Sequence, residues 1–215
     1  MLEDSKGRKI ILSDIDGVML DWMGGFSKWL NARFGWVEKP GSEIHYSVMN
    51  RFDELHDVGT VIELVTQFNN SDEFGQLSYF ADAESGVNLL RERLGDKVVI
   101  VPVTQIGNTP RSRALRQKNL SERFGADLFD FDLMYTFDLS EGKHRAFTRW
   151  QDSGILFIDD HAKHCQDAHE HGIHTFMFGT TYNVDDSIGG VRRINCWEDW
   201  VDAIEYNMFY EEYEV

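Results

Sequence analysis

The sequence predicts an α/β protein with a doubly wound parallel sheet that is covered by helices on both faces. Short apolar runs at residues 10–15, 98–103, 132–136, 154–158 and 173–178 have the length of buried strands. Helical patterns lie between the later runs, and strands that alternate with helices favour right-handed crossovers in one sheet. A further helical region follows the first run, so we expect a small helical cap inserted after the first strand.

The first apolar run, residues 10–15, delivers two carboxylates to its carboxyl end. Asp14 and Asp16 are separated by one residue, and Gly17 follows directly. Side chains alternate along a strand, so acids at this spacing share a face and can converge on one ion where the strand stops. A calcium-binding EF-hand loop would need a Glu at its twelfth position, where this chain has Gly25. We therefore expect Asp14 and Asp16 to carry chemistry at the end of this strand.

Residues 18–82 are too many for a single crossover helix and carry apolar residues at helical spacing. One such series is Trp22, Phe26, Trp29, Leu30 and Phe34, and another is Phe52, Leu55, Val58, Ile62, Leu64 and Val65. This spacing predicts an all-helical cap at 18–82 between two parts of an α/β core, 1–17 and 83–215. Trp22 follows the acidic strand directly, so we expect it beside the site, whereas the other apolar residues would form the core of the cap.

The second half of the chain continues the alternation of strands and helices. A helix at about 83–94 would return the chain to the sheet. Thr109 and Pro110 supply a helix cap and a first-turn proline, which predicts a helix from there to Phe124. Residues 161–171 predict another helix, closed by Gly172.

Polar side chains follow several of the predicted strands. In parallel sheets, ligands bind outside the carboxyl ends of the strands. The residues at such ends are Asp14, Asp16, Thr104, Asp159 and Asp160. The pattern of elements and the positions of the polar residues therefore indicate the same edge of the sheet.

Four segments, in this order, resemble the motifs of the haloacid dehalogenase-like phosphohydrolases. They are residues 14–18 (Asp-Ile-Asp-Gly-Val), the run ending at Thr104, Lys143 at the head of residues 143–147, and the apolar run ending in Asp159 and Asp160. The resemblance implies a Rossmann-like core and hydrolysis of a phosphomonoester. It also implies that Asp14 is a nucleophile that forms an aspartyl-phosphate, and that Asp16 is the general acid and base.

The resemblance further implies how the phosphate and a cation are held. Thr104 and Lys143 would bind phosphate oxygens. Mg²⁺ suits a site built of oxygens, and its ligands would be the Asp14 carboxylate, the Asp16 backbone carbonyl and Asp159, with Asp160 in support. The cation would offset the repulsion between the anionic nucleophile and the phosphate.

Residues 16–26 are similar to the opening of the 5′(3′)-deoxyribonucleotidases, as are residues 158–160 and 192–197. This similarity implies a nucleoside or deoxynucleoside monophosphate as substrate, with Trp22 stacked on the base. Gln105 follows Thr104 where that branch favours Ser, and we assign it to substrate binding. A sugar-phosphate phosphatase, a polynucleotide-end phosphatase and a catalytically inactive binding protein remain open alternatives.

The composition limits the partners of the chain. The net charge is −16, from 37 acidic and 21 basic residues, and such a surface repels polynucleotides and anionic membranes. A local basic strip, Arg111, Arg113, Arg116 and Lys118, is the route by which a single-strand end could still bind. A small phosphorylated substrate is therefore the expected partner, and the oligomeric state is open, with a homodimer as one option.

Cysteine and histidine usage supports two further expectations. Cys165 and Cys196 have no metal-ligand spacing, and no apolar run approaches the roughly 18 residues of a membrane span, so we expect a cytoplasmic protein with reduced thiols. Five histidines follow the last acidic pair and are close enough in sequence for a second metal site: His161, His164, His169, His171 and His174. Solvated histidines on a helix surface are the simpler interpretation.

Overall fold

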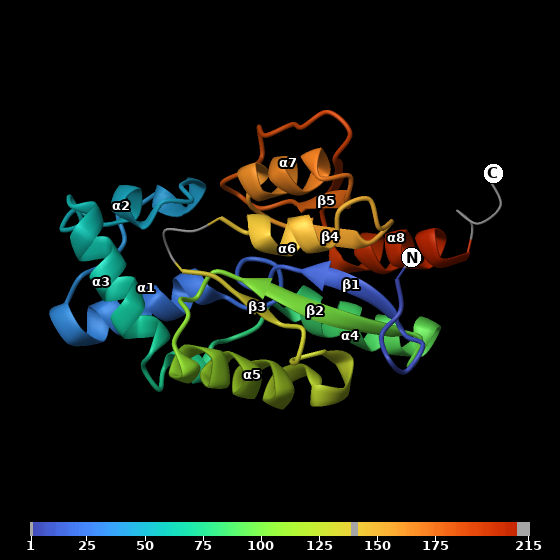
Figure 1. Ribbon diagram of the computed structural model, residues 1–215. Coiled ribbons are helices and arrows are strands. Elements are labelled where there is room, and N and C mark those ends of the chain that lie inside the picture. Colours follow the sequence, from blue (N-terminus) through green and yellow to red (C-terminus); the bar gives the residue numbers. More distant parts are fainter. Residues whose placement is uncertain (1, 139–141, 210–215) are drawn as a thin grey trace.

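The computed structural model describes residues 2–138 and 142–209, and its centre is a six-stranded sheet (Figure 1). The strand order is β3-β2-β1-β4-β5-β6, and every pairing is parallel. The strands are β1 (Lys9–Ser13), β2 (Val98–Thr104), β3 (Tyr135–Thr136), β4 (Leu156–Asp159), β5 (His174–Phe178) and β6 (Arg192–Ile194). The five expected strands are confirmed, and β6 extends the sheet beyond them.

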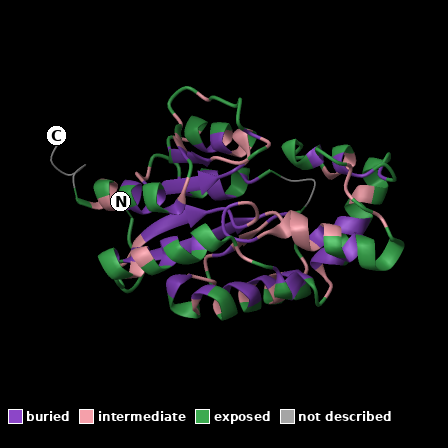
Figure 2. Cartoon of the chain, turned by 180° about the vertical axis from the view of Figure 1, so that it is seen from behind, coloured by how far each residue is buried: buried purple, intermediate pink, exposed green. Residues whose placement is uncertain are grey.

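Helices cover both faces of the sheet, as expected for a doubly wound fold. They are α4 (Ala81–Leu94), α5 (Pro110–Phe124), α6 (His144–Arg149), α7 (Ala162–Glu170) and α8 (Trp197–Phe209). Ile11, Ile100 and Ile158 pack with buried residues of α4, α5 and α8. Leu12 and Phe157, their neighbours along the strands, pack with residues of α6 and α7. Alternate strand residues therefore enter two separate apolar layers, and the strands are buried on both sides (Figure 2).

The segment between β1 and α4 is helical, and it lies at one end of the sheet (Figure 1). It contains α1 (Trp22–Phe34), α2 (Val48–Arg51) and α3 (Val58–Asn69), together with the short 3₁₀ turns η1 (Ser42–Ile44) and η2 (Phe74–Gln76). Aromatic rings fill its interior: Trp22, Phe26, Trp29, Phe68 and Phe74. These rings belong to the same apolar cluster as one face of the sheet. The division into a cap at 18–82 and a core at 1–17 and 83–215 therefore stays a proposal.

Local sequence signals explain where the later helices begin and end. The Thr109 side chain accepts a hydrogen bond from the Ser112 backbone N–H at the start of α5, and Pro110 occupies the first turn. Helix α7 ends before Gly172, whose φ of +69° lies in the left-handed region that glycine adopts without steric cost. A third 3₁₀ turn, η3 (Ala126–Leu128), follows α5.

Among the described residues, no helix combines the length and the apolar character that crossing a bilayer requires. Cys165 and Cys196 are both free thiols, and Cys165 is buried.

The chain reverses direction across the sheet at β1. From β1 it builds outward to β2 and β3 on one side, and it then crosses to β4, β5 and β6 on the other. Neighbouring connections leave a crevice at such a point, outside the carboxyl ends of the strands. Residues that follow β1 and β4 therefore meet in one place.

Candidate active site

Three carboxylates meet at the carboxyl ends of β1 and β4. Asp14 follows β1 directly, Asp159 is the last residue of β4, and Asp160 follows it. The strands are paired, with Ser13 beside Ile158, so the acids are brought together by the sheet register. One oxygen of each carboxylate lies within 4.8 Å of the others, and all three residues are buried.

Lys143 supplies the positive charge inside this cluster. It stands at the N-terminus of α6 and is 1 % exposed. Its Nζ lies 2.8 Å from Asp14 Oδ2 and 2.7 Å from Asp159 Oδ2. One ammonium therefore faces three buried carboxylates, which leaves the cluster with an excess of negative charge.

This excess changes the protonation of the carboxyl groups. Burial raises the pKa of Asp14 to about 7, and the neighbouring Asp159 and Asp16 add to the effect while Lys143 opposes it. Burial and the charge of Asp159 also hold the pKa of Asp160 well above its usual range. Burial would raise the pKa of Asp159 as well, but Lys143 and His164 outweigh it and lower that pKa. Burial therefore favours the protonated forms of Asp14 and Asp160, an effect that a bound cation would oppose.

The donor set fits Mg²⁺. Asp14, Asp159 and Asp160 offer hard oxygen ligands in a buried cluster whose negative charge Lys143 does not balance. Mg²⁺ is held in proteins by few carboxylates together with water. The nearby Cys165 does not add a soft sulfur ligand to this cluster, because its buried Sγ is directed to the Asp159 and Phe176 carbonyls.

Asp160 is fixed by the loop after β5 and by the backbone of Gly17. The Tyr182 hydroxyl donates a hydrogen bond to Asp160 Oδ2, and the Asn183 side-chain amide donates to the Asp160 carbonyl at 2.7 Å. Gly17 has a φ of +84°, and a Cβ on it would lie 1.8 Å from Asp160 Oδ2. The chain after Asp16 can approach Asp160 this closely because residue 17 is glycine.

Asp16 contacts a residue that the sequence did not indicate for the site. Arg116 Nη2 lies 2.6 Å from Asp16 Oδ1 and 2.7 Å from Oδ2, and Thr104 Oγ1 lies 3.3 Å from Oδ2. The Arg116 side chain is fully buried in α5, and its guanidinium lies 4.6 Å from the centre of the Phe74 ring. Thr104 is also fully buried, at the end of β2.

The four basic residues of α5 do not form the single exposed strip that the sequence suggested. Arg116 is buried against Asp16, and Arg113 donates to the carbonyls of residues 131 and 134 at 2.6 and 2.7 Å. Arg111 is paired with Asp72, and Lys118 with Glu122. A helical stripe was the missed signal: Arg116 shares its face of α5 with Leu120 and Phe124, which are also buried.

A cavity of about 660 Å³ opens beside the carboxylates. Trp22 and Gln105, both expected to contact substrate, line it. The Trp22 ring stacks on Phe26 with 4.9 Å between centroids, and its Nε1 donates to Asn69 Oδ1 at 2.9 Å. The Gln105 amide donates to the Asp138 carbonyl at 3.2 Å. The orientation of both side chains is therefore set by protein contacts.

The helical segment after β1 contributes the opposite wall of this cavity. The residues of this wall come from η1, α2 and the loop between them, and they are Glu43, Tyr46, Val48 and Arg51. The Tyr46 ring lies 4.3 Å from the His161 ring, centroid to centroid. A hydrogen bond of 2.9 Å from Thr181 Oγ1 to the Glu43 carbonyl joins the two walls. Polar and apolar groups from distant parts of the chain thus enclose the carboxylates.

The five late histidines do not form one cluster, which agrees with the simpler interpretation that they do not share a metal site. His161 and His164 lie beside the acids: the His161 backbone N–H donates to Asp159 Oδ1 at 2.8 Å, and His164 Nδ1 is 3.3 Å from Asp159 Oδ2. Burial lowers the pKa of His161 to about 4, so it is uncharged near neutral pH. His171 instead lies near Asp167 at the other end of α7. The helix separates histidines that are neighbours in sequence.

The chain resembles known proteins both in sequence and in fold. No protein-family model matches the sequence. An uncharacterized 32.4 kDa protein of Enterobacteria phage T4 is 32% identical over 165 residues, which are 74% of this chain and 56% of that protein. The chain thus spans little more than half the length of this relative.

Solved structures with the same architecture cover nearly the whole chain. A predicted phosphatase from Clostridium acetobutylicum superposes with a TM-score of 0.65 at 13% identity, over 92% of this chain and 98% of its own. A haloacid dehalogenase-like hydrolase from Streptococcus pneumoniae gives a TM-score of 0.63 at 13% identity, over 93% and 99%. The chain therefore has the fold of the haloacid dehalogenase-like hydrolases, as the sequence motifs predict.

Proposed function

We propose that this protein is a Mg²⁺-dependent phosphomonoester hydrolase that acts through an aspartyl-phosphate on Asp14. The observation that carries the proposal is the meeting of Asp14, Asp159 and Asp160 around Lys143 at the reversal point of the sheet. Asp16 stands two residues after the proposed nucleophile. Hydrolases and phosphatases share this fold, which supports the reaction class.

The reaction has two displacements. In the first, an Asp14 carboxylate oxygen attacks phosphorus, the ester P–O bond breaks, and the leaving oxygen takes a proton from Asp16. In the second, water gives a proton to Asp16 and attacks phosphorus, so the bond to Asp14 breaks and inorganic phosphate leaves. Lys143 lines the cavity and supplies positive charge for the equatorial oxygens, which carry the developing charge, whereas the buried Thr104 hydroxyl contacts Asp16 Oδ2.

The Mg²⁺ would be held by three carboxylates and one backbone carbonyl, those of Asp14, Asp159 and Asp160 and that of Asp16. The bound cation offsets the repulsion between an anionic nucleophile and an anionic phosphate. Burial raises the pKa of Asp14 to about 7, and Lys143 opposes this rise, so the lysine favours the unprotonated nucleophile. Tyr182 and Gly17 keep Asp160 in place beside it.

We further propose a nucleoside or deoxynucleoside monophosphate as the substrate. The cavity of about 660 Å³ has room for a group much larger than phosphate, and Trp22 offers an aromatic surface within it. Acidic residues outnumber basic ones on its walls outside the carboxylate cluster, where the lining includes Asp21, Glu43 and Asp82 as well as Arg51. A leaving group with hydroxyl and amine donors suits these walls better than one that carries a second phosphate.

The alternatives are weaker on specific observations. A polynucleotide end would need the basic strip on α5, and its residues are buried or paired with acids and carbonyls. A sugar phosphate would leave the aromatic wall at Trp22 unused. The free thiols at Cys165 and Cys196 support a reducing compartment, and we place the enzyme in the cytoplasm.

A substrate panel tests this proposal. Hydrolysis of an aryl phosphate should require Mg²⁺ and stop in excess chelator, and nucleoside monophosphates should have higher kcat/KM than sugar phosphates. No turnover of any phosphomonoester by the folded, Mg²⁺-loaded protein would favour a binding protein on the same fold. A preference for sugar phosphates would refute the nucleotide assignment and leave the phosphatase.

A further inference from the structure

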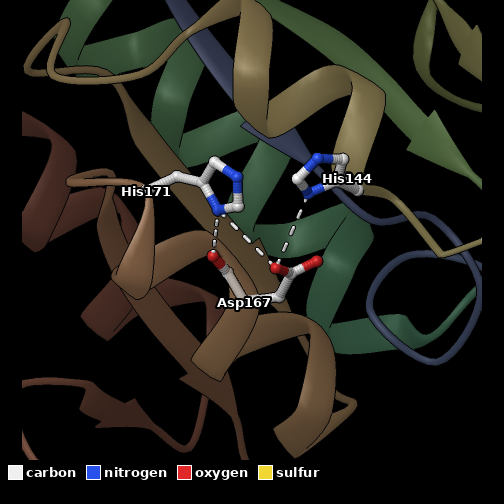
Figure 3. A group of neighbouring side chains, drawn as sticks. All are labelled: His144, Asp167 and His171. Atoms are coloured by element: carbon white, nitrogen blue, oxygen red, sulfur yellow. Dashed lines mark hydrogen bonds and ion pairs between the residues drawn. The ribbon is translucent and has the colours of Figure 1, made fainter.

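We propose that His144, Asp167 and His171 form a second metal site, which takes a divalent transition metal of the Zn²⁺ class. The three side chains converge on the outer surface between α6 and α7 (Figure 3). They share no residue with the carboxylate cluster. The proposed metal ligands are therefore distinct from the proposed catalytic residues.

The separations of the ligand atoms fit a small ion. His171 Nδ1 lies 3.6 Å and His144 Nδ1 lies 4.0 Å from the same atom, Asp167 Oδ1. One ligand atom from each of the three residues lies within 4.8 Å of the others. Tetrahedral Zn²⁺ with arms of about 2.0–2.1 Å separates its ligands by about 3.3 Å. Small rotations of the side chains would close the present arrangement around such an ion.

The protein framework already orients the three residues. Asp167 and His171 are four residues apart at the end of α7, and His144 is the first residue of α6. His144 Nε2 lies 3.3 Å from Thr148 Oγ1, which leaves Nδ1 for the metal, and a hydrogen bond to the other ring nitrogen fixes the ring of a metal-binding histidine. His171 Nδ1 lies 2.6 Å from the Asp167 carbonyl, so an ion bound through this nitrogen would replace that contact. The two imidazole rings meet edge to face with centroids 4.7 Å apart.

The ligand types select the metal. Two imidazoles and one carboxylate suit Zn²⁺, Ni²⁺ or Cu²⁺, whereas Mg²⁺ prefers the all-oxygen cluster at the carboxyl edge of the sheet. The side chains of His144, Asp167 and His171 are 65%, 33% and 17% exposed, so an ion from solution can reach them. Three protein ligands leave at least one position for water.

A bound ion would connect α6 to α7 next to Lys143. His144 follows Lys143 in the chain, and Lys143 holds both Asp14 and Asp159. A metal on His144 would thus tie down the N-terminus of the helix that presents this lysine. We expect the ion to stabilise the folded protein, with little direct part in any reaction.

Titration with Co²⁺, followed by its visible absorption, tests the site in the presence of excess Mg²⁺, which fills the oxygen cluster. Zn²⁺ titration by calorimetry gives the stoichiometry. The wild-type protein should bind one more transition-metal ion per chain than the His144→Ala/His171→Ala double variant. The single His144→Ala variant, at an exposed position, should bind at least about tenfold more weakly. His56→Ala, at an exposed histidine of the helical segment, is the matched control and should bind like the wild type.

Thermal unfolding gives a second readout that does not depend on activity. Free Zn²⁺ at about 100 times its Kd should raise the Tm of the wild type by roughly 5–10 °C. The double variant should lose this rise while keeping the Tm of the metal-free wild type. Equal stoichiometry in the wild type and the double variant, or an unchanged Tm in both, would overturn the proposal.

Discussion

Arg116 holds both carboxylate oxygens of Asp16 through one nitrogen atom, Nη2, at 2.6 and 2.7 Å. The guanidinium is fully buried, and its Nε and Nη1 have no hydrogen-bond partner among the described residues. A buried and incompletely satisfied charge costs free energy. Its position therefore points to a role beyond stability, namely the orientation of the proposed general acid and base.

Replacing this arginine should reduce catalysis more than binding. In Arg116→Met, Asp16 loses the contact that fixes its carboxylate, so kcat should fall by about 10- to 100-fold, a part of the roughly 10²–10⁴-fold that acid–base catalysis contributes. KM should change little, because Arg116 does not line the cavity. Steady-state kinetics with one mononucleotide measures both. Lys118→Met, at an exposed position of the same helix, is the control, and a wild-type kcat in Arg116→Met would exclude the orienting role.

Gly17→Ala should remove activity through a steric clash. The added Cβ would lie 1.8 Å from Asp160 Oδ2, so Asp160 would be displaced from the carboxylate cluster. The left-handed backbone alone costs of order 1–3 kcal/mol for a residue other than glycine. Gly41→Ala separates the two effects, because Gly41 has a φ of +76° and open space around it. Turnover should be lost in Gly17→Ala and retained in Gly41→Ala, and equal activity in both would contradict the assigned place of Asp160.

The stabilising effect of Mg²⁺ should grow with pH. In the folded protein, burial raises the pKa of Asp14 to about 7 from a usual value of 3.8. The protonated Asp14 carboxyl group therefore makes its full contribution to folding stability below about pH 4, and this contribution is lost as the pH rises through 7. Mg²⁺ needs the unprotonated carboxylate and compensates for this loss. The difference in Tm between Mg²⁺ and chelator should therefore increase from roughly pH 5 to 8. Asp14→Asn should flatten this trend, and a difference that shrinks with pH would refute the proposed ligand.

Trp22 should control the preference for a base. Stacking on a base is worth about 1–3 kcal/mol, so Trp22→Ala should narrow the preference for mononucleotides over sugar phosphates by roughly 10- to 100-fold. Trp22→Phe keeps an aromatic face and loses the hydrogen bond to Asn69, so it should keep most of the preference. The ratio of kcat/KM values between substrates is the measurement. If Trp22 only packs against Phe26, both variants lose stability and the ratio does not change.

The sequence predicted the sheet and the meeting of its polar ends for physical reasons. Asp14, Thr104 and Asp159 lie at the ends of three of the five apolar runs, and the register of the parallel strands β2, β1 and β4 placed those ends side by side. It could not predict β6, because Arg192 and Arg193 are polar and three residues are too short for a periodic signal. Strand β6 forms because β5 offers it a parallel edge.

Side-chain partners that depend on tertiary contacts were less accessible. Arg116 looked like one member of an exposed basic strip, since charge alone does not reveal the burial of a helix face. The histidines that follow Asp160 separated along α7, and His144, from a different helix, became a neighbour of His171. The apolar stripe of α5 marks the buried face that carries Arg116, but neither contact partner has a local sequence signal, because each contact joins residues from different elements.

The proposed mechanism requires a covalent bond between Asp14 and phosphorus. An aryl phosphate, whose leaving group needs little protonation, should phosphorylate Asp14 rapidly even in Asp16→Asn, while hydrolysis of the intermediate is slowed by the loss of the base. Acid quenching followed by mass spectrometry of the peptide that contains Asp14 is the direct measurement. The peptide should carry one phosphoryl group when Mg²⁺ is present and none in Asp14→Asn. An unmodified Asp14 during turnover, or full activity of Asp14→Asn, would contradict the proposed mechanism.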